Sequence, residues 1–124
     1  MNIDMIRAAN ARLVGQKRVT PMLSSPFLDQ IAGRQLLVKA ECLQHTGSFK
    51  FRGGFAAVSA LPAHQRARGV IAFSSGNHAQ GVALAARMHG VAATIIMPAD
   101  APAMKIANTR AYGAEVVLYD RAGG

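Results

Sequence analysis

A lysine flanked by two aromatic residues is the first candidate for chemistry in this sequence. Lys50 lies between Phe49 and Phe51 in the string TGSFKFRGG, residues 46–54, at the expected start of a helix. A lysine must be neutral to attack a carbonyl carbon, and both apolar surroundings and a helix N-terminus disfavour its ammonium form. Most lysines are solvated surface residues, but the combination of these features predicts that Lys50 is a nucleophile.

A string of small and polar residues, SSGNHAQG, occupies residues 74–81, directly after an expected strand and at the opening of an expected helix. Ligands collect at the C-terminal ends of parallel strands, and the N–H groups of a helix N-terminus attract anions there. Ordinary capping by Ser74 or Asn77 is the alternative, although eight residues are more than capping requires. The string is a candidate anion site, and both interpretations stay open.

Three β-branched apolar runs in the second half of the chain predict the frame that positions this string. Each run follows a glycine, the starts are 21 and 23 residues apart, and helical patterns separate them at about 77–89 and 102–112. Strands and helices that alternate at this spacing are typical of βαβ units with right-handed crossovers. We therefore predict an α/β fold with a parallel sheet, and we expect Asp100 to cap the second of these helices.

The first half of the chain carries weaker patterns. Apolar residues at helical spacing from Ile3 to Leu13 predict a first helix that ends at Gly15, and alternation predicts a strand over residues 35–41. A further helix is expected from Ser48, where the apolar period changes, to Leu61, because Pro62 stops it. Gly53 and Gly54 lie in its first turns, where glycine costs stability, so a packed helix or a ligand is expected to approach that side closely.

Composition and charge limit the class of protein. The chain has 124 residues, 51% hydrophobic and 16% charged, which is typical of one globular core. Its net charge of +8 divides into ten Lys and Arg against three acids in residues 1–68 (+7) and four against three in residues 69–124 (+1). The charges are scattered without interleaved aromatic residues, so nucleic-acid binding is not expected.

The remaining compositional features argue against a disulfide, a metal site and a membrane span. Cys42 is the only cysteine, which excludes an intrachain disulfide, and the four histidines lack a zinc-binding spacing, so no metal is expected. The sequence has no apolar stretch long enough to span a membrane, and a cytoplasmic protein is expected.

Together, the two strings resemble those of fold-type II pyridoxal-phosphate (PLP) enzymes, the tryptophan synthase beta-like group. TGSFKFRGG is similar to the segment that holds the cofactor lysine, and SSGNHAQG is similar to the loop that binds the substrate carboxylate. Within this superfamily, SSGNH followed by AQG resembles the serine and threonine dehydratases, or threonine ammonia-lyases, and serine racemase. The segments RLVGQKRVTPML, LVKAECLQ, TIIMPADAP and AYGAEVVLYD extend the likeness to nearly the whole chain.

The resemblance implies a role for each residue of the two strings. PLP would be held covalently by Lys50, which would then act as the base at the substrate α-carbon. Phe49 would lie beside the cofactor ring, and Asn77 would form a hydrogen bond with the 3′ oxygen of PLP. In racemase-like members, the serine that matches Ser75 is the base on the opposite face. The substrate carboxylate would be held by five consecutive residues: Ser74, Ser75, Gly76, Asn77 and His78.

The function implied for a full-length enzyme is β-elimination from L-threonine or L-serine, which gives a 2-oxo acid and ammonia. The alternatives are serine racemase-like amino-acid racemisation and an inactive, truncated βα module that binds an anion. Residues 1–52 would belong to a large PLP-binding domain, and residues 53–124 to an incomplete small α/β domain. The phosphate-binding loop of the family is expected beyond residue 124. A homo-oligomer that binds neither nucleic acid nor membranes is expected at full length.

Overall fold

The computed structural model describes residues 2–123. The helices and strands follow one another along the chain in this order: α1 (Ile3–Leu13), β1 (Met22–Leu23), α2 (Pro26–Ala32), β2 (Val38–Lys39), α3 (Lys50–Ala60), α4 (Ala63–Arg66), β3 (Val70–Phe73), α5 (Asn77–Met88), β4 (Ala93–Pro98), α6 (Ala103–Ala111) and β5 (Glu115–Tyr119). Two short 3-10 turns, Glu41–Leu43 and His45–Gly47, lead from β2 into α3.

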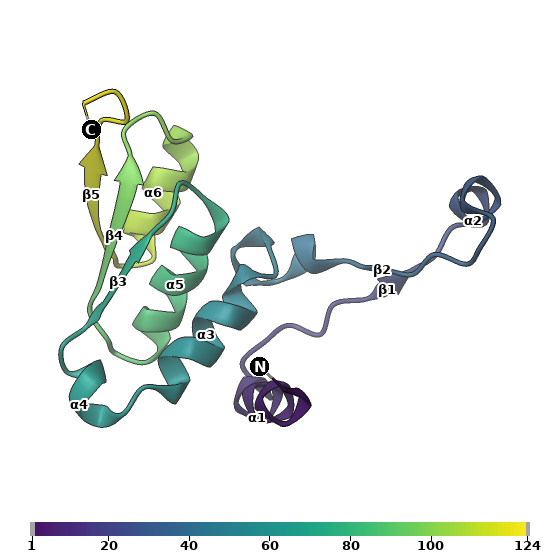
Figure 1. Cartoon of the computed structure of the whole chain (residues 1–124), viewed down its shortest axis with the longest axis horizontal. Coiled ribbons are helices and arrows are strands. Elements are labelled where there is room, and N and C mark those ends of the chain that lie inside the picture. The colour runs from purple at the N-terminus through teal and green to yellow at the C-terminus, as the bar shows by residue number, and fades with distance from the viewer. Residues whose placement is uncertain (1, 124) are drawn as a thin grey trace.

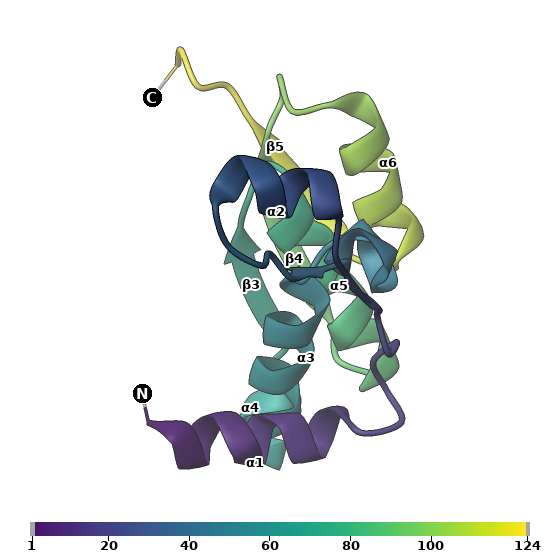
Figure 2. The same cartoon turned by 90° about the vertical axis from the view of Figure 1, so that its right-hand side faces the viewer.

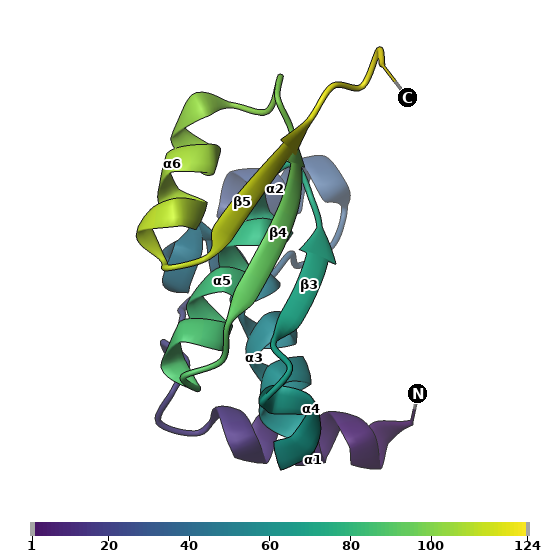
Figure 3. The ribbon, with the colours of Figure 1, turned by 90° about the vertical axis from the view of Figure 1, so that its left-hand side faces the viewer.

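The second half of the chain forms a parallel sheet in the order β3-β4-β5. Ile95 pairs with Ala72 on one side and with Val116 on the other, so β4 is the central strand. Helices α5 and α6 cover one face of the sheet, and Figure 3 looks onto the opposite face. The predicted α/β fold with parallel βαβ units is therefore confirmed.

The core lies between the sheet and α5. Ile95 and Met97 of β4 are fully buried, and α5 presents small residues to them, including Ala79 and Ala86. Small side chains allow α5 to pack closely on two neighbours at once, the sheet and α3. Phe51 and Phe55 of α3 fill the space on the other side of α5. The packing of α5 between these two layers holds its N-terminus in a fixed position.

An arm extends from this layered body (Figure 1), and in Figure 2 it points toward the viewer. Strands β1 and β2 form a two-residue antiparallel pair, with Met22 opposite Lys39, and α2 lies at the tip. The predicted strand over residues 35–41 is wrong in extent, because only Val38 and Lys39 pair and a 3-10 turn begins at Glu41. Helix α2 was not predicted.

The four helices predicted from apolar spacing are confirmed within one or two residues at each end. The expectation that Asp100 caps the last helix is wrong, however. The residue before α6 is Pro102, and the Asp100 carboxylate instead accepts a hydrogen bond of 2.9 Å from Arg121 Nε.

Within residues 2–123, none of the helices has the length and hydropathy that a membrane crossing requires.

Candidate functional site

Two glycines bring the two predicted strings into contact. A Cβ added to Gly54 of α3 would lie 2.8 Å from the carbonyl oxygen of Gly81 in α5. A Cβ added to Gly81 would lie 2.8 Å from the carbonyl oxygen of Lys50. Real Cβ atoms do not approach backbone atoms this closely, so α3 and α5 can cross here only because both positions are glycine. The helix that carries Lys50 is thus seated directly on the end of the SSGNHAQG string.

This contact distinguishes between the two explanations for the paired glycines of α3, a packed helix and a ligand. The close approach expected at Gly54 is made by a packed helix and not by a ligand. Gly53 differs, because a Cβ built there would meet no described atom within 4 Å. Gly53 instead borders a hollow of about 250 Å³ between α3 and β3, which is also lined by His78. A larger hollow of about 550 Å³ lies next to it, near Gly69 and Ala92 at the N-terminal ends of β3 and β4.

Lys50 is the first residue of α3 and is half-buried. Its Nζ atom lies 4.9 Å from the centroid of the Phe49 ring, and that ring is 58% exposed. The Lys50 backbone N–H donates to Ser48 Oγ at 3.4 Å. No acidic side chain of residues 2–123 forms an ion pair with Lys50. Within the described residues, the amine thus has no carboxylate partner and lies beside an exposed aromatic ring.

The turn that leads into α3 carries the one described residue other than glycine with a positive φ. Thr46 has a φ of 61°, and Gly47 follows with a φ of 70°. The Thr46 hydroxyl is buried, with no partner among the described residues. Backbone strain and an unpaired buried hydroxyl are costly and concentrate at functional sites. Both features occur four residues before Lys50.

The loop from β3 into α5 carries the five residues expected to hold a carboxylate. Ser74 Oγ accepts a hydrogen bond of 3.2 Å from the Gly76 N–H, and Gly76 is buried. The side chains of Ser75, Asn77 and His78 are exposed. Helix α5 has no side-chain cap among the described residues, so the N–H groups of its first turn remain open to an anion. The loop is therefore a candidate anion site.

Helix α6 reaches this loop from the side opposite α3. Lys105 Nζ donates a hydrogen bond of 3.0 Å to Asn77 Oδ1, and Asn108 Nδ2 donates one of 3.3 Å to Gln80 Oε1. Neither contact was anticipated from the sequence. The only signal for them was the spacing of two polar residues three positions apart on one helix, which is too common to identify partners.

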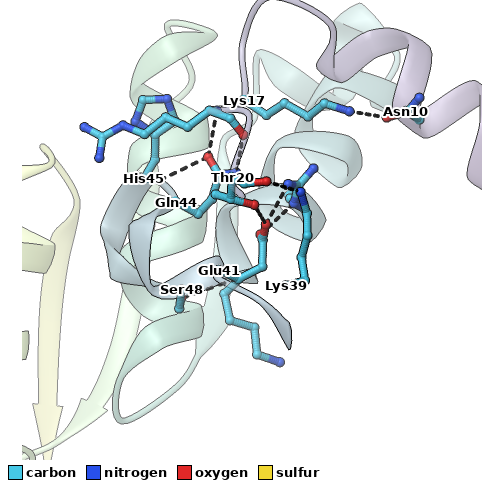
Figure 4. A network of polar contacts seen from close by, with 11 residues as sticks. Asn10, Lys17, Thr20, Lys39, Glu41, Gln44, His45 and Ser48 are labelled. Carbon is cyan, nitrogen blue, oxygen red and sulfur yellow. Dashed lines mark hydrogen bonds and ion pairs between the residues drawn. The ribbon is translucent and has the colours of Figure 1, made fainter. Parts of the chain in front are cut away.

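A polar network ties the N-terminal arm to the helix of Lys50 (Figure 4). Both oxygens of Glu41 accept from the Arg52 guanidinium, at 2.6 and 2.7 Å, and Glu41 Oε1 also accepts from Thr20 Oγ1 at 2.5 Å. The hydrogen bonds from Arg52, followed by that from Thr20, outweigh burial and lower the pKa of Glu41 to about 2. The same ion pair raises the pKa of Arg52. Arg52, to which the sequence assigned no chemistry, anchors the first turn of α3.

The profile of the family described as "Pyridoxal-phosphate dependent enzyme" matches residues 13–124. The chain belongs to this family.

Individual members of the PLP-dependent family are similar over almost the whole chain. An L-threo-3-hydroxyaspartate ammonia-lyase from a Pseudomonas species is 58% identical over 118 residues, which is 95% of this chain and 37% of that protein. The structure of maize serine racemase aligns with a TM-score of 0.91 at 43% identity, over 96% of this chain and 36% of the racemase. The structure of a threonine deaminase from T.th. aligns with a TM-score of 0.83 at 49% identity, over 98% of this chain and 37% of the deaminase. The chain spans about a third of the length of these relatives.

The residues present fit PLP, the cofactor of this family. A half-buried amine, Lys50, lies beside the exposed ring of Phe49, and together they suit an aldehyde on a flat aromatic ring. The Asn77 carbonyl oxygen is bonded to Lys105, so the amide NH₂ group is left to donate to a negatively charged oxygen. The Lys50 backbone lies against Gly81 at the α3–α5 crossing, and Gly81 is one turn after Asn77 in α5.

Proposed function

We propose that the full-length protein catalyses PLP-dependent β-elimination from L-threonine or L-serine and releases a 2-oxo acid and ammonia. The observation that carries the proposal is the backbone contact between Lys50 and Gly81, which brings the helix that carries Lys50 against the helix that follows the candidate carboxylate loop. Ammonia-lyase and threonine deaminase relatives, at 58% and 49% identity, support this reaction class.

Lys50 is proposed to attach the cofactor covalently and to move a proton at the substrate α-carbon. PLP, when bound, supplies the electron sink that makes this proton acidic. The exposed ring of Phe49 would lie against the flat cofactor, and the Asn77 amide, whose oxygen is bonded to Lys105, would donate to the 3′ oxygen. Arg52 acts at a distance, because its ion pair with Glu41 fixes the turn from which Lys50 projects.

The substrate carboxylate is proposed to bind at the loop between β3 and α5. Open N–H groups in the first turn of α5 attract the negative charge, and exposed hydroxyl and amide groups add directed hydrogen bonds. A carboxylate held here would place the neighbouring α-carbon toward the helix that carries Lys50. The proposed carboxylate-binding residues are Ser74, Ser75, Gly76, Asn77 and His78.

Racemisation is the second candidate function. Ser75 is exposed on the same loop, and a serine racemase is among the structural relatives. A base at Ser75 and a base at Lys50 on opposite faces of the α-carbon could remove a proton from one side and return it from the other. An inactive anion-binding module remains the outcome if neither reaction is detected.

The test is an assay of the full-length protein with L-threonine, L-serine and L-threo-3-hydroxyaspartate, the last chosen from the name of the Pseudomonas relative. Ammonia and 2-oxo acid should appear in equal amounts, and the enantiomer composition of the remaining substrate should be measured alongside. Lys50→Ala should abolish turnover, while Lys17→Ala, at a lysine in the turn after α1, should retain it. Turnover that survives Lys50→Ala would refute the proposal.

We also propose the wider organisation from the resemblance. Residues 1–52 are proposed to belong to a large PLP-binding domain and residues 53–124 to a small α/β domain. The full-length protein is proposed to be a cytoplasmic homo-oligomer that binds neither nucleic acid nor membranes. Light scattering of the purified full-length protein, with and without added DNA, tests both the oligomeric state and the expected lack of nucleic-acid binding.

A further inference from the structure

The contact between Lys105 and Asn77 determines which way the Asn77 amide points. An asparagine amide has a carbonyl that only accepts and an NH₂ group that only donates, and a half-turn of the side chain exchanges them. An ammonium group can only donate. Lys105 Nζ lies 3.0 Å from Asn77 Oδ1, so the carbonyl side of the amide is bonded to α6 and the NH₂ side is directed elsewhere.

Lys105 also covers the backbone of the loop. A Cβ added to Gly76 would lie 3.0 Å from Lys105 Nζ, 3.2 Å from Cδ and 3.6 Å from Cε. Gly76 is therefore buried by the Lys105 side chain and not by another backbone segment. A larger residue at position 76 would push Lys105 away and would break its bond to Asn77.

A second amide contact holds α6 in place for this purpose. Asn108, one turn after Lys105, donates to Oε1 of the buried Gln80, one turn after Asn77. The two hydrogen bonds join a pair of residues three positions apart in α6 to a pair three positions apart in the first turns of α5. The position of the Lys105 ammonium group is thus set by the packing of two helices and not by the side chain alone.

We propose that Lys105 is a positioning residue that fixes the Asn77 amide with its NH₂ group presented to the 3′ oxygen of PLP. This inference rests on the proposed function, because the partner of Asn77 is assigned there. Without Lys105, both amide orientations become accessible, and the orientation that presents the carbonyl to a negatively charged oxygen is repulsive.

The test compares three variants of the full-length protein. Lys105→Met keeps the aliphatic cover over Gly76 but removes the donor, and Lys105→Arg restores a charged donor. Lys17→Met is the matched control, because Lys17 also donates to an asparagine amide oxygen, that of Asn10, away from the site (Figure 4). One hydrogen bond at this exposure corresponds to about a 3- to 10-fold change in affinity.

Titration of the apoprotein should therefore show PLP binding weakened about 3- to 10-fold in Lys105→Met, largely recovered in Lys105→Arg and unchanged in Lys17→Met. The visible absorption of the bound cofactor should change in Lys105→Met, because a merely structural lysine would not alter it. In an Asn77→Ala background, Lys105→Met should have no further effect. A full additional loss in that background, or unchanged affinity in Lys105→Met, would overturn the proposal.

A readout without cofactor separates this proposal from the proposed function. The side-chain amide resonances of Asn77 in the apoprotein should shift in Lys105→Met and stay in place in Lys17→Met. Unchanged resonances would refute the role of Lys105 even if the protein is an ammonia-lyase. If the resonances shift as expected but the wild-type protein binds no PLP, the proposed function is refuted instead.

Discussion

Replacement of Gly54 by alanine tests the helix crossing that joins the two halves of the site. The new Cβ would stand 2.8 Å from the oxygen and 2.9 Å from the carbon of the Gly81 carbonyl. The two backbones must then separate by on the order of half an ångström, and overpacking of this kind costs about 1–3 kcal/mol. Alanine gains about 1 kcal/mol of helix propensity. The net expectation is an unfolding free energy lower by up to about 2 kcal/mol.

Gly53→Ala is the matched control, one residue earlier in the same helix. Its Cβ meets no described atom within 4 Å, so only the propensity gain of about 0.5–1 kcal/mol remains. Urea denaturation of the full-length protein should place Gly53→Ala above the wild type and Gly54→Ala below it. The apparent affinity for PLP should also fall in Gly54→Ala, because Lys50 moves away from the loop. Equal stability of the two variants would refute the close crossing.

Two further predictions concern the Glu41–Arg52 pair and the chain on its own. Because Arg52 holds the pKa of Glu41 near 2, below its ordinary value of 4.5, the pair stabilises the fold above about pH 4.5 and loses this effect as the pH falls toward 2. Arg52→Gln should lower the unfolding free energy by about 1–3 kcal/mol at pH 7. In urea titrations, the difference in unfolding free energy between this variant and the wild type should become smaller by about pH 3. A difference that does not change with pH would contradict the pairing. Residues 1–124 alone, with a three-stranded parallel sheet that leaves one face open, should aggregate and release no more ammonia from L-threonine or L-serine than free PLP. Soluble, Lys50-dependent turnover by this chain would contradict that expectation.

The sheet could be predicted from the sequence because its signals are local. Each strand is a β-branched run within one window, and each helix between strands repeats its apolar residues at helical spacing. The arm could not be predicted, because its elements are too short to carry a local signal. Strands β1 and β2 pair over two residues each, and α2 has only seven residues, about two turns, which is too short for an apolar period to stand out in the sequence.

The candidate site divides in the same way. The strings around Lys50 and Ser74 are continuous in sequence and were found by their residue types. The groups that position them were missed because they come from distant segments. Arg52 pairs with a residue 11 positions away, and Lys105 donates across 28 positions to Asn77. No local spacing encodes such a pairing, and only the packing of α6 beside α5 brings the second one together.

Borohydride reduction of the full-length protein, followed by peptide mass spectrometry, tests the central claim most directly. Reduction makes the link between PLP and a lysine permanent, so the modified residue can be identified. The pyridoxyl group is predicted on Lys50, the half-buried amine beside Phe49 at the helix crossing. A yellow protein that carries the group on Lys39 or Lys105 instead would contradict the assignment of Lys50.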